Sequence, residues 1–146
     1  SLTEKEESKI AVQYYDYISK IEKRFKKKIQ ICHWGHIEQS VFKKLGEKYR
    51  RVKKFDENQY VDMEKVFRKN PIVVRGVFNT KLKDVSKVLV KSKYHLLHVQ
   101  NGGDAMEAAN RIYKQDVIEK NDWDNIRHYN QLDVRTLYDI HKKLIT

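Results

Sequence analysis

The sequence predicts a helix-rich α/β domain with few and short strands. Apolar residues recur at intervals of three and four over long segments, which is the period of an α-helix that buries one face. The alternation typical of strands is confined to short stretches near positions 29–33 and 60–63. Two short strands do not form a stable sheet, so the domain is either mostly helical or completed by strands from elsewhere.

The first helix is predicted over Glu4–Phe25. Thr3 and Glu6 have the spacing of a capping box, in which each side chain bonds the backbone N–H near the other. Lysines and an arginine close the segment, which is favourable at a helix C-terminus. The apolar residues at helical spacing are Ile10, Tyr14, Tyr17, Ile18, Ile21 and Phe25.

A short strand over residues 29–33 is expected to lead through Trp34-Gly35 into a second helix, Ile37–Lys48. This arrangement places several polar residues directly after a strand, and the carboxyl ends of strands are where sites gather in open α/β sheets. Those residues are His33, His36 and Glu38. The second helix is expected to bury Ile37, Val41, Phe42 and Leu45.

The middle of the chain predicts shorter elements. Residues 60–63 read as a strand that continues into a helix through Phe67, which the Asn70-Pro71 step ends. A short lysine-rich helix is marked by Leu82, Val85, Ser86 and Leu89, and residues 94–100 are ambiguous.

Residues 101–103, Asn-Gly-Gly, predict a turn, with Asp104 as the cap of a helix over residues 105–113. Asn121 or Asp122 is expected to cap the last helix.

The last helix, over residues 123–144, carries a carboxylate in the middle of an apolar stripe. The stripe consists of Ile126, Tyr129, Asp133, Leu137, Ile140 and Leu144. Burying an isolated carboxylate is costly, so Asp133 needs a partner, a cation or a water-filled cleft. The alternative is that Asp133 is tilted to the edge of the stripe and solvated.

The composition favours a polyanionic partner. The 146 residues, the size of one domain, include 31 Lys+Arg against 20 Asp+Glu, a net charge of +11. A soluble basic protein without such a partner is the alternative. The single cysteine, Cys32, excludes an internal disulfide and a multi-cysteine zinc site, and it fits a reducing intracellular compartment such as cytoplasm or nucleus.

No apolar run approaches the roughly 20 residues of a membrane span, so no membrane partner is expected. Nucleic acid is the expected partner, and a basic linker with Arg50, Arg51, Lys53 and Lys54 adds to the positive charge. The further basic residues expected to bind phosphates are Lys26, Lys27, Lys28, Arg75, Lys81, Lys83 and Lys87.

Carboxylates from separate elements indicate a possible chemistry. Glu38 lies just past one strand, Asp62 lies at another strand-to-helix junction, and Asp133 lies on the last helix. Acidic groups that converge on one cleft hold the hard Mg²⁺ or Mn²⁺ ions of two-metal phosphoryl chemistry. A Tyr or His beside one of them can orient the attacking water.

Two motifs carry a resemblance to a known family. Residues 33–38 read His-Trp-Gly-His-Ile-Glu, and residues 129–133 read Tyr-Asn-Gln-Leu-Asp. In this order they resemble the ribonuclease H-like DEDD 3′–5′ exonucleases, and among these the predicted exonuclease domains. The resemblance spans residues 4–144 and includes the segments 60–63, 81–83 and 103–106.

The resemblance implies a ribonuclease H-like fold and a two-metal site with Mg²⁺ or Mn²⁺. Glu38 matches the carboxylate of the family's second motif, and Asp133 matches that of its last motif, so both would be metal ligands. Tyr129 matches the tyrosine version of the last motif, and His128 has the spacing of the histidine version. A helix places Tyr129 on the face of Asp133 and His128 off it, which favours Tyr129.

The family's first motif, an Asp-x-Glu on a leading strand, has no counterpart here. Glu4, Glu6 and Glu7 lie at a helix start, where they favour the helix dipole. Residues 1–146 are therefore expected to be the C-terminal portion of a ribonuclease H-like exonuclease domain. The first strands and their acidic motif would come from the rest of a larger polypeptide or from a companion chain.

Two other functions remain open. One is a non-catalytic nucleic-acid-binding or structural module with a degenerate nuclease fold, and the other is a helical protein-interaction domain. The choice between DNA and RNA, and the participation of Asp62 or Asp104 in a site, also stay open.

Overall fold

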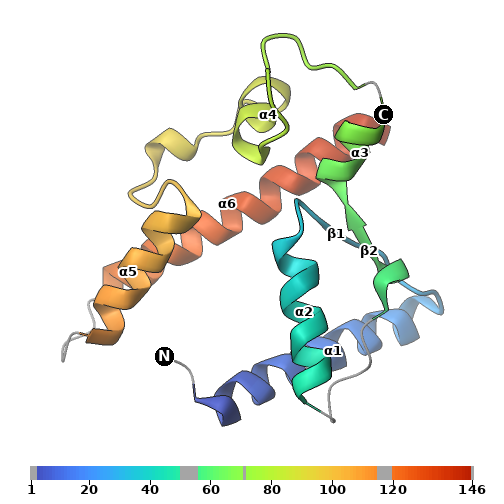
Figure 1. The fold of residues 1–146 in the computed structure, drawn as a ribbon, viewed down its shortest axis with the longest axis vertical. Helices are drawn as coiled ribbons and strands as arrows, with labels where there is room; N and C mark the ends of the chain where they lie inside the picture. The colour runs from blue at the N-terminus through green and yellow to red at the C-terminus, as the bar shows by residue number, and fades with distance from the viewer. Residues whose placement is uncertain (1–2, 50–55, 71, 115–119, 146) are drawn as a thin grey trace. The chain divides into compact units, whose positions relative to one another are not determined.

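The computed structural model describes residues 3–49, 56–70, 72–114 and 120–145. The chain divides into two compact units, Ser1–Asn70 and Pro71–Thr146, and each is described by itself. The described residues form six α-helices and a two-stranded sheet, so the chain is helix-rich, as the sequence predicts (Figure 1). No helix among them has the length and apolar character needed to cross a membrane.

The first unit opens with α1 (Glu4–Phe25), which begins and ends where the sequence predicts. The Thr3 hydroxyl accepts a hydrogen bond from the Glu6 backbone N–H at 3.3 Å, and the Glu6 carboxylate accepts one from the Thr3 N–H at 2.8 Å. This reciprocal pair is the predicted capping box. Lys26 follows in the left-handed conformation, with φ of 52°, and ends the helix.

The buried face of α1 differs from the predicted stripe. Ala11, Tyr15 and Ile18 are buried, whereas Ile10 and Tyr17 are 52% and 62% exposed. The reason is the position of α2 (Ile37–Lys48), which packs where Ala11 and Tyr15 lie. Helical spacing alone allows two neighbouring stripes, and the partner helix selects one of them.

The prediction for α2 is confirmed in its bounds and wrong in half of its buried residues. Phe42 packs against α1, with its ring stacked on that of Tyr14 at 4.4 Å between centroids, and Leu45 packs beside it. Ile37 and Val41 are instead 67% and 47% exposed.

The sheet consists of β1 (Ile31–His33) and β2 (Tyr60–Asp62), which run parallel and side by side (Figure 1). The register pairs Ile31 with Tyr60 and His33 with Asp62, so the carboxyl ends of both strands meet at one edge. The turn η1 (Glu57–Gln59) precedes β2, and α3 (Met63–Lys69) follows it directly.

In the second unit, two helices pack on one long helix. Both α4 (Leu82–Leu89) and α5 (Gly102–Lys114) lie against α6 (Lys120–Ile145), and the short turn η2 (Tyr94–Leu96) connects them (Figure 1). The central cluster of buried residues joins η2, α5 and α6, and its members are Tyr94, Val99, Ala108, Ile112, Ile126 and Tyr129.

Two predicted helix starts in this unit are wrong. The Gly102-Gly103 pair forms the first turn of α5 and not a separate turn. The cap is Asn101, whose side-chain oxygen accepts the Asp104 N–H at 3.0 Å, because an Asn carbonyl is as good a cap as an Asp carboxylate. Helix α6 begins at Lys120, before the predicted caps Asn121 and Asp122.

The apolar stripe of α6 is largely confirmed. Ile126, Tyr129 and Ile140 are buried, with Ile140 fully so. Thr136, which was not expected there, is only 2% exposed, whereas Leu144 is 38% exposed. Asp133 lies half-buried between the buried turns.

We expect truncation of a side chain in the core of the second unit to lower stability more than truncation of an exposed side chain. Ile112→Ala should lower the free energy of unfolding by about 2–5 kcal/mol, because Ile112 is 1% exposed and its truncation leaves a cavity. Met106→Ala on the same helix is the control, since Met106 is 69% exposed and should cost less than about 0.5 kcal/mol. Urea unfolding measures both, and equal losses would contradict the assignment of the core.

The tyrosines of the first unit predict a loss of stability at alkaline pH. Burial, followed by hydrogen bonding to Tyr14, raises the pKa of Tyr60 above its ordinary value. The unfolded chain loses this proton above pH ~10 while the folded protein keeps it, so the free energy of unfolding falls as the pH rises. Tyr60→Phe should flatten that fall by at most about 1.4 kcal/mol per pH unit, measured by urea unfolding between pH 8 and 11. Parallel curves for the variant and the wild type would show that Tyr60 does not contribute.

Candidate functional site

The best-defined cluster of polar groups surrounds the Asp133 carboxylate in the second unit. The Tyr94 hydroxyl donates a hydrogen bond to Asp133 Oδ1 at 2.6 Å, a short distance typical of an O–H donor to a charged acceptor. Tyr94 and Tyr129 are 7% and 8% exposed. The half-buried carboxylate on the stripe of α6 therefore has a partner.

The surroundings of the two tyrosines raise their pKa values above the ordinary value. Burial is the first cause that raises the pKa of Tyr94 and of Tyr129, and interaction with the Asp133 carboxylate is the second. Their ring centroids lie 6.3 Å apart, and the Tyr94 hydroxyl donates to Asp133. Near neutral pH both groups act as hydrogen-bond donors and not as bases.

A lysine covers the two rings. Lys83 Nζ lies 5.1 Å from the ring centroid of Tyr94 and 5.1 Å from that of Tyr129, within the range of cation–π attraction. The same ammonium group donates a hydrogen bond to the Gln100 carbonyl. Burial lowers the pKa of Lys83, while the charges of Asp133 and Asp104 act in the opposite direction.

Asp104 holds the backbone beside this lysine. Its carboxylate accepts the Gln100 N–H at 3.0 Å, and this backbone hydrogen bond is the main reason that its pKa is lowered. Asp104 thus fixes the residue whose carbonyl binds Lys83. Asp104 therefore lies beside the cluster and supports the backbone that contacts Lys83.

Local structure explains how these groups meet. Tyr129 and Asp133 are four residues apart on α6 and share a face. After α4, Lys91 adopts a left-handed conformation with φ of 53°, and the Ser86 and Ser92 hydroxyls hydrogen-bond at 2.7 Å. These features turn the chain so that η2 presents Tyr94 to Asp133.

His128 lies on another face of α6. It is exposed and lines a polar cavity of about 600 Å³. The other polar residues of that cavity are His98, Arg111, Asn121, Asp122, Asp124 and Asn125. Of the two candidate water-orienting residues, only Tyr129 belongs to the Asp133 cluster.

In the first unit, Glu38 lies in the first turn of α2 with its side chain half-exposed. Its Oε2 is 3.8 Å from Nδ1 of His33, a residue that is 4% exposed and whose ring nitrogens have no hydrogen-bond partner among the described residues. The buried imidazole and the exposed carboxylate thus meet at the carboxyl end of β1, where the sequence predicts a site.

Asp62 has a structural role at the same edge. Its Oδ1 accepts backbone N–H groups from Gly35 and Glu64 at 3.0 Å and from Lys65 at 3.3 Å. It therefore caps α3 and fixes the turn after β1, where Gly35 has a φ of 84°. Because one of its oxygens accepts these three backbone hydrogen bonds, Asp62 stabilises the local fold.

The predicted metal ligands are of the chemical type that binds a divalent ion, but too few of them lie together to form a site. Carboxylate oxygens are the ligands that Mg²⁺ and Mn²⁺ prefer. Within the described parts of the chain, however, no group of three or more His, Cys, Asp or Glu side chains is placed to hold a metal ion. Glu38 belongs to the first unit and Asp133 to the second, so each unit supplies one of the predicted carboxylates.

The predicted phosphate-binding residues fall into two kinds. Lys26, Lys27, Arg75, Lys81 and Lys87 are exposed, and Lys28 is exposed and pairs with Asp56 at 3.3 Å. Lys83 differs, because it is partly buried and held against two rings. The basic linker with Arg50, Arg51, Lys53 and Lys54 lies outside the described residues.

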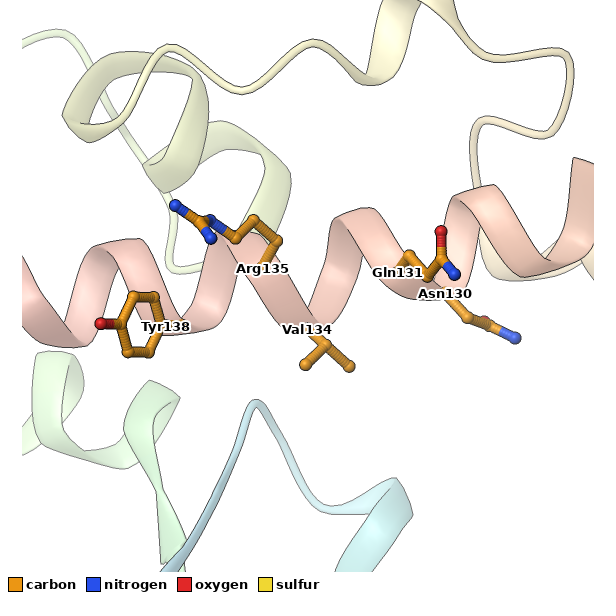
Figure 2. A pocket seen from close by; sticks show the side chains of 5 residues that line it. All are labelled: Asn130, Gln131, Val134, Arg135 and Tyr138. Atoms are coloured by element: carbon orange, nitrogen blue, oxygen red, sulfur yellow. The ribbon is translucent and has the colours of Figure 1, made fainter.

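A second surface lies on α6 and is mainly apolar. Figure 2 shows Val134 and Tyr138 on α6, with Val134 pointing away from the side towards which Arg135 extends. They are 71% and 54% exposed, and with Asn130, Gln131 and Arg135 they line a groove of about 560 Å³. Such a face is the kind of surface that a helical interaction domain uses.

Sequence reasoning missed two members of the cluster. Tyr94 lies in a segment without a clear period, and nothing local indicates that its hydroxyl meets a helix 39 residues further on. Thr136 takes the place of an apolar residue on the stripe and is 2% exposed. A buried hydroxyl near a half-buried carboxylate on one stripe is the signal that points to a polar network.

Comparison with known proteins does not assign a family. No protein-family model matches the chain, and no curated protein or solved structure shows significant similarity to it. The motifs at residues 33–38 and 129–133 remain the basis of the exonuclease hypothesis.

The hydrogen bond between Tyr94 and Asp133 predicts energetic coupling. In a double-mutant cycle, Tyr94→Phe and Asp133→Ala should couple by about 1–3 kcal/mol, the range for a hydrogen bond to a charged group. The control cycle pairs Tyr94→Phe with Asp139→Ala, since Asp139 binds Arg135 at 3.2 Å. Its two effects should add within about 0.5 kcal/mol. Urea unfolding provides the four free energies, and equal coupling in both cycles would contradict the bond.

Proposed function

We propose that the chain contributes to metal-dependent 3′–5′ exonuclease-type hydrolysis of nucleic acid. The first acidic motif of the site would be supplied by another part of a larger polypeptide or by a companion chain. The observation that carries this proposal is the Asp133 carboxylate, half-buried and held by the Tyr94 hydroxyl beside Tyr129 and Lys83. The resemblance of the two motifs to the exonuclease family supports the same function.

Asp133 is the carboxylate of the second unit that would hold Mg²⁺ or Mn²⁺, and Glu38 of the first unit is a metal ligand only as the resemblance implies. When bound, such an ion lowers the pKa of a coordinated water and stabilises the negative charge of the leaving oxygen. The contribution of Tyr94 is to fix Asp133 Oδ1, so that the carboxylate keeps one orientation. Fixing a ligand in this way favours a defined site over a mobile one.

The role of Tyr129 follows from the protonation state of its hydroxyl group. A phenol is protonated near neutral pH, and burial and the Asp133 charge raise the pKa of Tyr129 further above its ordinary value. A protonated phenol can orient a water molecule or a phosphate oxygen by donating a hydrogen bond, but it cannot remove a proton. Tyr129 is therefore proposed as a positioning group for the attacking water, and His128, on the other face of α6, is not needed for this role.

The charge of the chain supports nucleic acid as the substrate. A net charge of +11 produces long-range attraction to a phosphate backbone without sequence preference. Exposed lysines such as Lys81 and Lys87 supply part of this attraction.

A non-catalytic nucleic-acid-binding module is the second candidate. It is favoured by the absence of a group of three metal-binding side chains within the described segments. It would retain salt-sensitive binding and lack hydrolysis. A helical protein-interaction domain, favoured by the exposed groove of α6 in Figure 2, would show neither property.

The test begins with the native polypeptide or complex that carries this chain, defined by intact mass and subunit content. With Mg²⁺, this material should shorten a 5′-labelled oligonucleotide from its 3′ end, and Asp133→Asn should reduce the rate by at least about 10³-fold because a metal ligand is lost. Tyr129→Phe should reduce it by roughly 10–100-fold, since only the positioning of water is impaired.

Asp139→Asn is the matched control, because Asp139 lies on the same helix and pairs with Arg135. It should retain nearly the wild-type rate. Equal rates for Asp133→Asn and Asp139→Asn would overturn the proposed site. Salt-sensitive binding without any hydrolysis by the native material would favour the second candidate.

A further inference from the structure

The basic residues of this chain are not equivalent, and one of them is built into the cluster at Asp133. We propose that Lys83 binds a phosphate of the nucleic acid beside the Asp133 carboxylate, as a site-specific contact distinct from the general positive charge. This proposal rests on the proposed function and deepens it by naming the residue that holds the substrate's phosphate.

The position of the ammonium group is the first argument. It lies over both tyrosine rings, at 5.1 Å from each centroid, and donates to the Gln100 carbonyl. An ammonium group has three N–H donors, and the carbonyl takes one of them. Lys83 as a whole is half-buried and not enclosed, and two donors remain for the proposed phosphate.

Restraint of the side chain is the second argument. A free lysine loses rotamer entropy when it fixes a phosphate, and this loss weakens binding. Lys83 is already restrained by the rings of Tyr94 and Tyr129 and by the Gln100 carbonyl. That carbonyl is in turn fixed, because Asp104 binds the Gln100 N–H. The cation is thus placed before the ligand arrives.

Two lysines near Lys83 in the sequence lack its contacts. Lys81 precedes α4, and Lys87 lies one turn after Lys83 on that helix; both are exposed. Neither has a cation–π contact among those found in the described residues. They contribute to salt-dependent attraction, whereas Lys83 places its charge within the cluster that contains Tyr129 and Asp133.

The charge of Asp133 gives the contact a distinctive property. A phosphate bound at Lys83 is attracted by the ammonium group and repelled by the nearby carboxylate. Without divalent ions, removing that carboxylate charge should therefore strengthen phosphate binding. An exposed lysine far from Asp133 does not have this dependence, so it separates the proposed contact from a general basic surface.

The experiment measures binding of a fluorescein-labelled single-stranded 12-mer, as DNA and as RNA, by anisotropy in EDTA. Lys83→Gln should weaken binding about tenfold or more, because it removes a restrained charged donor. Lys87→Gln should weaken it only about two- to threefold, as loss of one exposed charge does. Lys83→Arg should restore part of the affinity, and Asp133→Asn should tighten binding, whereas Asp139→Asn should tighten it less.

A second measurement uses the wild-type chain and so does not depend on the folding of a variant. Reductive methylation of lysines, read by mass spectrometry of peptides, should show that the oligonucleotide protects Lys83 more strongly than Lys87. Circular dichroism checks that each variant keeps the helical content of the wild type. If Lys83→Gln unfolds, the footprint and Lys83→Arg decide the matter.

The outcomes separate the two proposals. If the native polypeptide or complex that carries this chain binds neither oligonucleotide, the proposed function is overturned, and this inference with it. A chain that binds, but in which Lys83→Gln behaves like Lys87→Gln or Lys83 is not protected, would overturn this inference alone. In that case Lys83 is a counter-ion that stabilises Asp133, and the phosphate contacts lie elsewhere.

Discussion

The packing of the second unit depends on one constraint. The apolar stripe of α6 carries a carboxylate in its middle, and this carboxylate needs a hydrogen-bond partner. An unpartnered carboxylate in that position would cost several kcal/mol. The Tyr94 hydroxyl supplies the partner at 2.6 Å, and this requires that η2 lie against α6. The segment between α4 and α5 is therefore fixed by the same bond that makes Asp133 tolerable. Lys83 and Tyr129 come together around the carboxylate as a consequence.

Sequence periodicity predicts most of the secondary structure because it records what each segment does by itself. The bounds of α1 and its capping box, the bounds of α2, and the shared face of Tyr129 and Asp133 all follow from local spacing. Which stripe of a helix becomes buried depends on its neighbour. On α1, packing by α2 selects Ala11 and Tyr15, and no local signal distinguishes them from the adjacent stripe.

The candidate site shows the same division. Asp133 and Tyr129 could be identified from the sequence, because a polar residue on an apolar stripe conflicts with its surroundings. Tyr94 could not, because its role is a contact between segments distant in sequence. The Asp104 cap was predicted on the right helix with the wrong function: Asn101 caps α5, while the Asp104 carboxylate binds Gln100 and supports Lys83. Residue type limits which roles are possible, and long-range geometry selects among them.

The protonation of the cluster limits the chemistry that it can perform. Tyr94 and Tyr129 both have raised pKa values, so near neutral pH they donate hydrogen bonds and do not accept protons. Lys83 can hold an anion, and Asp133 can accept hydrogen bonds or coordinate a cation. These groups together can bind and orient a phosphate and a water molecule, but removing a proton from that water needs an activating group besides the two phenols. In the proposed nuclease, that activating group would have to come from carboxylates beyond the Asp133 cluster, for which Glu38 and the first acidic motif are the candidates. The same cluster without them would retain the ability to bind nucleic acid.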